Sequence, residues 1–197
     1  MMFITIGEIL DMILMIAVVG FIFMDTFKLQ KKTEDVLDKY MHKSSGLFRS
    51  FNWHDFWFAA MVVAPSIILH ELGHKFTAMS YGLSATFNAA YLWLAIAILL
   101  KLVNFPIIFF IPAFVSIGGN PSAIQSALIA FAGPGINLFL FVIAYIVLKT
   151  QKLNVVKSQF WTLIKNINLF LFIFNMIPIP GFDGFTVFSG LWHVFGL

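Results

Sequence analysis

The sequence contains no cysteine and has few charged residues. Of its 197 residues none is Cys, and Asp, Glu, Lys and Arg together make up 11%. The absence of cysteine excludes disulfides, zinc sites built from thiolates and a cysteine nucleophile. An average soluble domain carries about 25% charged residues. A water-soluble globular domain is therefore not expected.

The chain is instead rich in apolar residues. They make up 60% of the chain and include 25 Phe. Several apolar stretches reach the roughly 20 residues that a helix needs to cross the hydrocarbon of a bilayer. The net charge is only +3, and the basic residues lie in loops between the apolar segments, so no nucleic acid partner is expected. The composition predicts a multi-pass integral protein of the cell membrane, with the lipid bilayer as its surroundings.

The first apolar stretch covers residues 1–24. It lacks the positive start and the small-residue cleavage site of a signal peptide, so we predict a retained transmembrane helix. Glu8 and Asp11 lie three residues apart near one end of it. An acid inside a membrane helix is a candidate functional residue. Polar side chains near a helix end can also reach the headgroups, and this is the interpretation that we favour for both.

The remaining chain divides into a polar loop and an apolar core. Residues 25–53 form a basic loop in which Thr33 could cap a short helix. We expect one membrane-embedded domain over 1–197, with its core at 55–190. The predicted class is all-α and polytopic, with about four to six transmembrane segments, a re-entrant or broken region and a helix unwound at prolines.

The second apolar segment, 55–80, contains the sequence HELGH, which begins at His70 and matches HExxH. On a helix, His70 and His74 share one face and can offer two imidazole nitrogens to one zinc ion. Glu71 lies beside that face and can act as general base toward water. Two core histidines with this spacing are the alternative, but so apolar a helix holds such groups poorly without partners. His70 lies roughly 22 Å along the helix from Asp55, which places the site within the membrane.

The succession of long apolar segments is interrupted over 87–117. Two apolar runs, 91–100 and 105–117, are too short to be confident spans. Lys101 and Asn104 interrupt them. We predict a re-entrant hairpin or a pair of short, tilted segments.

Two further spans are predicted, 122–149 and 160–177. The first contains the sequence GPGIN at 133–137, whose small residues permit close approach of another backbone. The second runs into 175–184, where two prolines unwind the chain and bring Asp183 into an apolar region. Unwound backbone persists at membrane depth only where it is buried in protein or lines a cavity.

The number of membrane crossings between the candidate ligands predicts that they approach the same side of the membrane. If the basic loops 25–53 and 149–160 lie on one side of the membrane, His70, His74 and Asp183 all approach the other side. Three protein ligands and one open position form the usual catalytic zinc site.

These segments resemble a known family. In their order, HELGH on a membrane helix, the GPGIN stretch and residues 175–184 are similar to the three core motifs of the site-2 proteases, which are intramembrane zinc metalloproteases. The resemblance covers 55–190 and is closest to compact microbial members without a PDZ-like or nucleotide-binding regulatory domain. Phe182 stands where the family usually has leucine. The resemblance implies single-pass membrane proteins as substrates, and one zinc per chain bound by His70, His74 and Asp183. It also implies that Glu71 activates water and that Asn137 and Asn175 line the substrate site.

The orientation in the membrane is open at this point. The resemblance implies cleavage toward the cytosolic leaflet. Lysine and arginine counting instead places 25–53 and 149–160 in the cytosol and the zinc toward the outside.

Other functions also stay open. A Ser–His protease could use Ser189 and His193, but the G-x-S setting is absent. An aspartyl protease would need a second membrane acid opposite Asp183, and Asp11 is the candidate. A membrane zinc-binding or zinc-transport protein would need the ligands but not Glu71, and transporters usually carry further polar groups along an ion path.

Overall fold

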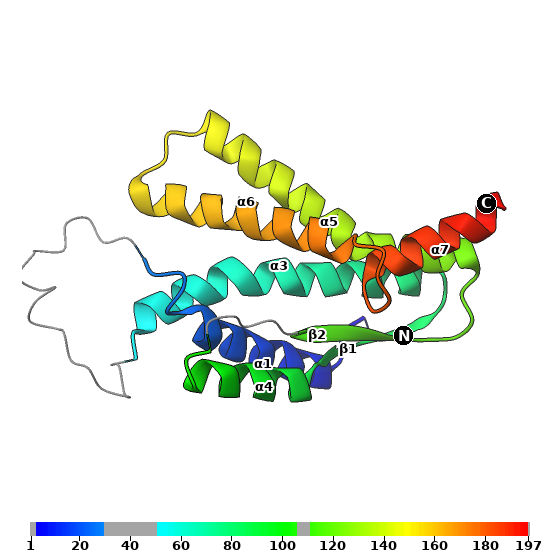
Figure 1. Cartoon of the computed structure of the whole chain (residues 1–197), viewed down its shortest axis with the longest axis horizontal. Coiled ribbons are helices and arrows are strands. Elements are labelled where there is room, and N and C mark those ends of the chain that lie inside the picture. Colours follow the sequence, from blue (N-terminus) through cyan, green and yellow to red (C-terminus); the bar gives the residue numbers. More distant parts are fainter. Residues whose placement is uncertain (1–2, 30–50, 106–110, 197) are drawn as a thin grey trace, which may run out of the picture.

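The computed structural model describes residues 3–29, 51–105 and 111–196. Most of these residues are helical, as the sequence predicts, but two short strands are also present (Figure 1). The expected basic loop over 25–53, with its short helix from Thr33, lies mostly outside the described residues. The elements in chain order are α1 (Ile6–Phe23), α3 (Trp53–Ser80), β1 (Ser84–Ala89), α4 (Tyr91–Leu102), β2 (Ala113–Gly118), α5 (Ala123–Thr150), α6 (Val155–Asn175) and α7 (Asp183–Phe195).

Three of the described helices, α1, α3 and α5, are long and apolar enough to cross a membrane, which is fewer than the four to six spans expected. The segment predicted as a span at 160–177 corresponds to α6, which has 21 residues but carries Lys157 and Lys165. In the most apolar 18-residue stretch of each helix, 61% of the stretch is buried inside the protein in α3, compared with 33% in α1 and 39% in α5. The protein therefore surrounds α3 more completely than the other two.

Helix α3 lies at the centre of the molecule. In Figure 1, α5 and α6 lie above it, whereas α1, α4 and the two strands lie below it. The α3–α5 contact is close because Gly73 faces the α5 backbone: a Cβ atom added at Gly73 would lie 2.9 Å from the carbonyl oxygen of Ala132. The glycines on α3 and α5 therefore bring the HELGH sequence directly against α5.

Helix α5 continues through Pro134 as one helix of 28 residues, whereas α6 ends at Asn175. The chain then turns through Pro178, Pro180 and Gly181 before α7 begins at Asp183. Gly181 has φ +99°, a value that favours glycine. The predicted unwinding at the two prolines is thus present, and it delivers Asp183 to the start of a new helix.

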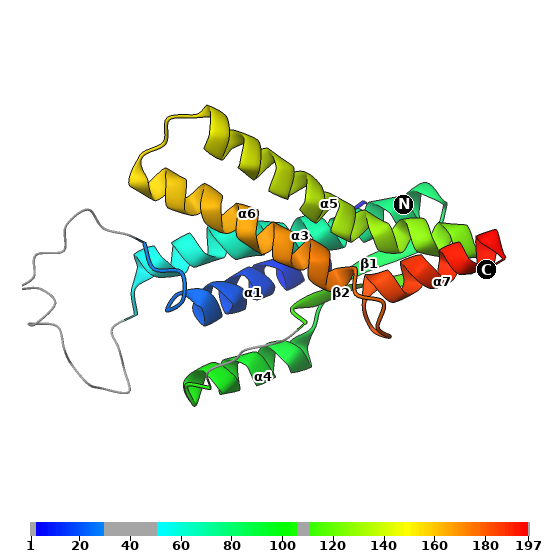
Figure 2. The same ribbon diagram turned by 45° about the horizontal axis from the view of Figure 1, so that its top comes forward.

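Residues 84–118 differ from the expected pair of apolar segments or re-entrant hairpin. Strands β1 and β2 pair antiparallel, from Ser84 opposite Gly118 to Ala89 opposite Ala113. The run predicted at 91–100 is helix α4, which lies beside α1 and away from α5 and α6 (Figure 2). The second run, 105–117, ends in a strand. A short apolar run does not distinguish a strand from a helix by its own pattern, so the pairing decides.

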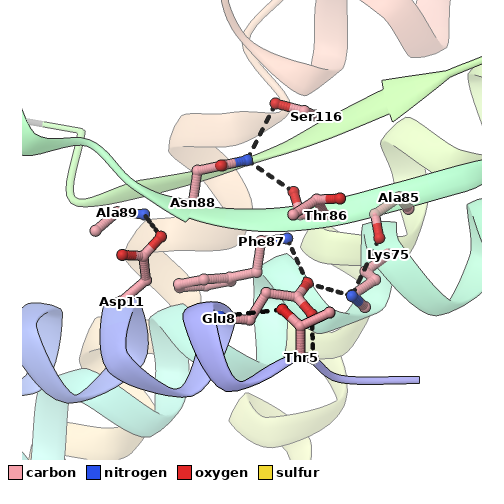
Figure 3. Close-up of polar contacts among 10 residues, drawn as sticks. All are labelled: Thr5, Glu8, Asp11, Lys75, Ala85, Thr86, Phe87, Asn88, Ala89 and Ser116. Atoms are coloured by element: carbon pink, nitrogen blue, oxygen red, sulfur yellow. Dashed lines mark hydrogen bonds and ion pairs between the residues drawn. The ribbon is translucent and has the colours of Figure 1, made fainter. Parts of the chain in front are cut away.

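The prediction that Glu8 and Asp11 reach lipid headgroups is wrong. Glu8 is 2% exposed and forms an ion pair with Lys75 of α3 (Figure 3). Asp11 is half-buried and accepts hydrogen bonds from the backbone of Ala89 and the hydroxyl of Tyr91. Both acids bind protein groups because α1 packs against β1 and α3.

Candidate metal centre

The structure brings His70, His74 and Asp183 together. The two histidines lie on one face of α3 and are each 7% exposed, and Asp183 is the first residue of α7. The Nε2 atoms of His70 and His74 are 3.1 Å apart. Asp183 Oδ2 lies 3.2 Å from His70 Nε2 and 3.4 Å from His74 Nε2. Three potential ligand atoms therefore form a nearly equilateral triangle.

The size of this triangle fits a zinc ion. Zinc binds histidine nitrogen and carboxylate oxygen at about 2.0–2.2 Å in tetrahedral geometry, which separates neighbouring ligand atoms by roughly 3.3 Å. Space for the ion is also kept open on the α5 side. A Cβ atom added at Gly133 would lie 2.3 Å from His74 Nε2 and 2.7 Å from His70 Nε2. Only glycine leaves the two nitrogens accessible at this point.

Hydrogen bonds on the far side of each ring orient the two histidines. His74 Nδ1 lies 2.7 Å from the carbonyl oxygen of Ile129, and His70 Nδ1 lies 2.6 Å from Asn137 Oδ1. Because both partners are acceptors, each Nδ1 donates a proton to its partner, so each Nε2 can present a lone pair to a metal ion at the centre of the triangle. This is the tautomer that a metal ligand requires.

Asn137 lies away from the cavity, although the resemblance implies that it lines a substrate site. It is 0% exposed and does not line the cavity beside the triangle. Its Nδ2 donates to the carbonyl oxygen of Ser66 at 3.1 Å and to Asn168 Oδ1 at 2.9 Å. With both ends of its amide bonded to protein, Asn137 contacts His70 and does not face the cavity.

Asn168 and Ser66 complete this buried network, and no short motif in the sequence marks either residue. Asn168 is 0% exposed, and its Nδ2 donates to Ser66 Oγ at 2.9 Å and to the carbonyl oxygen of Ile164 at 2.9 Å. A polar side chain on a helix in an apolar environment needs such a partner. This rule could have indicated that Asn168 lies inside the protein, but not which residue it contacts.

Burial and neighbouring histidines act on Asp183 in opposite directions. Burial raises the pKa of its carboxyl group, but hydrogen bonds with His70 and His74 outweigh burial and lower the pKa to about 2. Asp183 is therefore ionised at neutral pH. A carboxylate is the form that binds metal.

A cavity of about 890 Å³ opens beside the triangle and has a mostly apolar lining. Glu71 and Asn175 both line it, Glu71 next to His70 and Asn175 at the end of α6. The wall along α6 extends from Leu163 to Asn175, a helix length of roughly 18 Å. The other walls include residues of β2 and the aromatic rings at the end of α1. A cavity of this volume and length can hold several residues of an apolar peptide.

Neither alternative protease class is supported by the described residues. Ser189 Oγ donates to the carbonyl oxygen of Phe185 at 2.6 Å, a bond within its own helix. Asp11 is bonded to Ala89 and Tyr91 and is not part of the metal triangle. Among the described residues, the side chains that are arranged to hold a metal ion are those of His70, His74 and Asp183.

Comparison with known proteins points to the same chemistry. The chain is 36% identical over 151 residues to a protein of Methanocaldococcus jannaschii whose name assigns it, by inference, to the zinc metalloproteases; the match covers 72% of this chain and 76% of that protein. It is 30% identical over 138 residues to a similarly named protein of Synechocystis sp., covering 70% of this chain but 32% of that relative. No protein-family model matches the sequence. No solved structure matches it either. The ligand triangle fits what the names of these relatives say, and the chain belongs to a family of zinc metalloproteases.

Proposed function

We propose that the protein is an intramembrane zinc endopeptidase of the site-2 protease type, which hydrolyses peptide bonds in the membrane segments of single-pass proteins. The observation that carries this proposal is the location of the triangle. His70, Glu71 and His74 lie on α3, a helix long and apolar enough to cross a membrane, and face a mostly apolar cavity. Soluble substrates would gain little from such a lining.

The residues of the site have separate tasks. His70, His74 and Asp183 would hold one zinc per chain, which when bound supplies a Lewis acid that polarises a carbonyl group and activates water. Glu71 accepts the proton of the attacking water and then donates it to the nitrogen of the leaving amine. The nearly closed surroundings of Glu71, which is 9% exposed, limit the access of further water.

Asn175 is proposed to hold the substrate backbone. In a membrane helix the carbonyl groups are already bonded internally, so a cleavable segment must be partly unwound. Asn175 lines the cavity where α6 ends, and its amide can donate to a freed carbonyl or accept from a freed N–H group. Asn137, which is enclosed beneath His70, is assigned the separate role of orienting that ligand.

We further propose that α6 is a fourth membrane span. Its 21 residues rise about 31 Å, which is the thickness of the hydrocarbon layer. The polarity of α6 is partly internal, because Asn168 is fully buried and bonded to Ser66. With α6, the count reaches the lower end of the expected four to six spans.

The test is cleavage of a labelled single transmembrane peptide with a central Asn-Gly break, reconstituted with purified protein in lipid vesicles. Wild type should cut the peptide. Glu71→Gln should keep its zinc and lose activity by at least about 100-fold, the usual contribution of a general base. A zinc-binding or transport protein would cut nothing, and its zinc flux into vesicles would survive Glu71→Gln. Cleavage by Glu71→Gln at the wild-type rate would rule out the proposed mechanism.

A further inference from the structure

One edge of β1 is paired with β2, and the other edge is bonded by side chains from two helices. Lys75 Nζ donates to the carbonyl oxygen of Ala85 at 3.1 Å. The N–H of Phe87 donates to Glu8 Oε1 at 2.7 Å, and the N–H of Ala89 donates to Asp11 Oδ2 at 3.1 Å (Figure 3). These are alternate residues of the strand, as expected for the outward-facing groups of a strand edge. Side chains thus occupy the positions that a third strand would fill.

The ion pair at the centre of this arrangement is enclosed. Glu8 and Lys75 each expose 2% of their side chains, and each contacts the strand as well as the other charge. A buried charge is costly unless it is paired and hydrogen-bonded. Glu8 is also fixed from its own helix, because Oε2 accepts the N–H of Thr5 at 2.7 Å in a capping box. Both oxygens of the Glu8 carboxylate are therefore bonded to protein, and one of them binds the Phe87 N–H group of β1.

The position of β1 also determines the position of β2, which forms one wall of the cavity. The register joins Phe87 to Val115 and Ala89 to Ala113, and both partners on β2 line the cavity. Lys75 directly follows the metal-binding His74 in α3. The same group of side chains therefore fixes the distance between the ligand helix and the strand on the other side of the cavity.

We propose that Glu8, Asp11 and Lys75 are positioning residues that replace a third strand on β1 and hold β2 as the cavity wall against which the substrate binds. This inference rests on the proposed peptidase function. It predicts that loosening the strand weakens substrate binding, while the metal triangle, built on α3 and α7, keeps its zinc.

Two double variants separate this role from general stabilisation. Glu8→Leu with Lys75→Met removes both charges and the acceptor of the Phe87 N–H group. Glu8→Gln with Lys75→Met also removes both charges but retains a side-chain oxygen for Phe87. Asp25→Asn is the matched control, because Asp25 pairs with Lys101 of α4 at 3.1 Å and this pair does not include a residue of β1.

The measurements are amide hydrogen exchange of β1 and β2, zinc content, and KM and kcat for the labelled transmembrane peptide. The Leu/Met protein should exchange faster in both strands and retain one zinc. Its KM should rise about threefold to tenfold, with a smaller change in kcat, as expected for the loss of a hydrogen bond that acts on binding. The Gln/Met protein keeps an acceptor for Phe87 but loses the bond from Lys75 to Ala85, so its exchange and KM should rise less than those of the Leu/Met protein. Asp25→Asn should stay near wild type in both.

If the Leu/Met protein does not fold, the matched pair Asp11→Ala and Asp11→Asn gives the same comparison at the half-buried acid. The alanine variant loses the acceptor of the Ala89 N–H group, and the asparagine variant retains one, so only the former should raise KM. The positioning role alone is overturned if KM is unchanged in both the Leu/Met protein and Asp11→Ala. It is also overturned if kcat and zinc content fall without a rise in KM. Failure of the wild type to cleave, or cleavage by Glu71→Gln, overturns the peptidase function and this inference with it.

Discussion

Replacing Asn137 by alanine should weaken zinc binding without touching a ligand. Asn137 Oδ1 is the acceptor at 2.6 Å that fixes the His70 ring and its tautomer. Partners of this kind usually contribute tenfold to 100-fold in metal affinity. The dissociation constant for zinc should therefore rise by this factor, which corresponds to about 1.4 to 2.7 kcal/mol.

The same substitution also has a cost in stability. It removes the bonds of the Asn137 amide to Ser66 and Asn168 and leaves their oxygens buried without these donors. We expect the free energy of unfolding to fall by roughly 2 to 4 kcal/mol. Asn168→Leu is the matched variant, because it disrupts the same buried network but leaves the His70 to Asn137 contact in place. It should lower stability by a similar amount and alter zinc affinity less.

The assay is competition for zinc with a chelator of known affinity, alongside visible spectroscopy of the cobalt-substituted proteins and thermal unfolding. Asn137→Ala should show weaker metal binding and an altered cobalt spectrum, whereas Asn168→Leu should retain a spectrum close to wild type. If the two variants lose stability equally and bind zinc equally well, Asn137 does not orient His70. The structural argument would then be refuted.

Three further substitutions test the site. Gly133→Ala should abolish zinc binding, because its Cβ would lie 2.3 Å from His74 Nε2; a full complement of zinc by elemental analysis would contradict this. Asp183→Ala should weaken zinc retention on dialysis, since it removes the third corner of the triangle, and unchanged retention would exclude Asp183 as a ligand. Asn175→Ala should keep its zinc but slow peptide cleavage by about 2 to 4 kcal/mol in activation free energy if Asn175 stabilises the oxyanion, and wild-type turnover would remove it from the substrate site.

The features that depend on residue type and short spacing could be predicted from the sequence alone. Few charges and long apolar runs predict membrane helices, and three of the described helices are long and apolar enough to cross a membrane. The interval between His70 and His74 matches the helical repeat, so the two rings share one face wherever the helix lies. Pro178 and Pro180 interrupt a helix through their backbone chemistry alone, and the chain does unwind there.

The roles of the individual polar residues depend on tertiary packing and could not be predicted from the sequence. Asn137 and Asn175 both stand near prolines in apolar segments, yet one is enclosed beneath His70 and the other lines the cavity. Glu8 reaches no headgroup, because Lys75 of α3 and the backbone of β1 lie beside it. A polar side chain in an apolar segment must find a partner, and that requirement is readable from the sequence. Which partner it finds depends on which helices pack together, and long-range packing is not encoded in the local pattern.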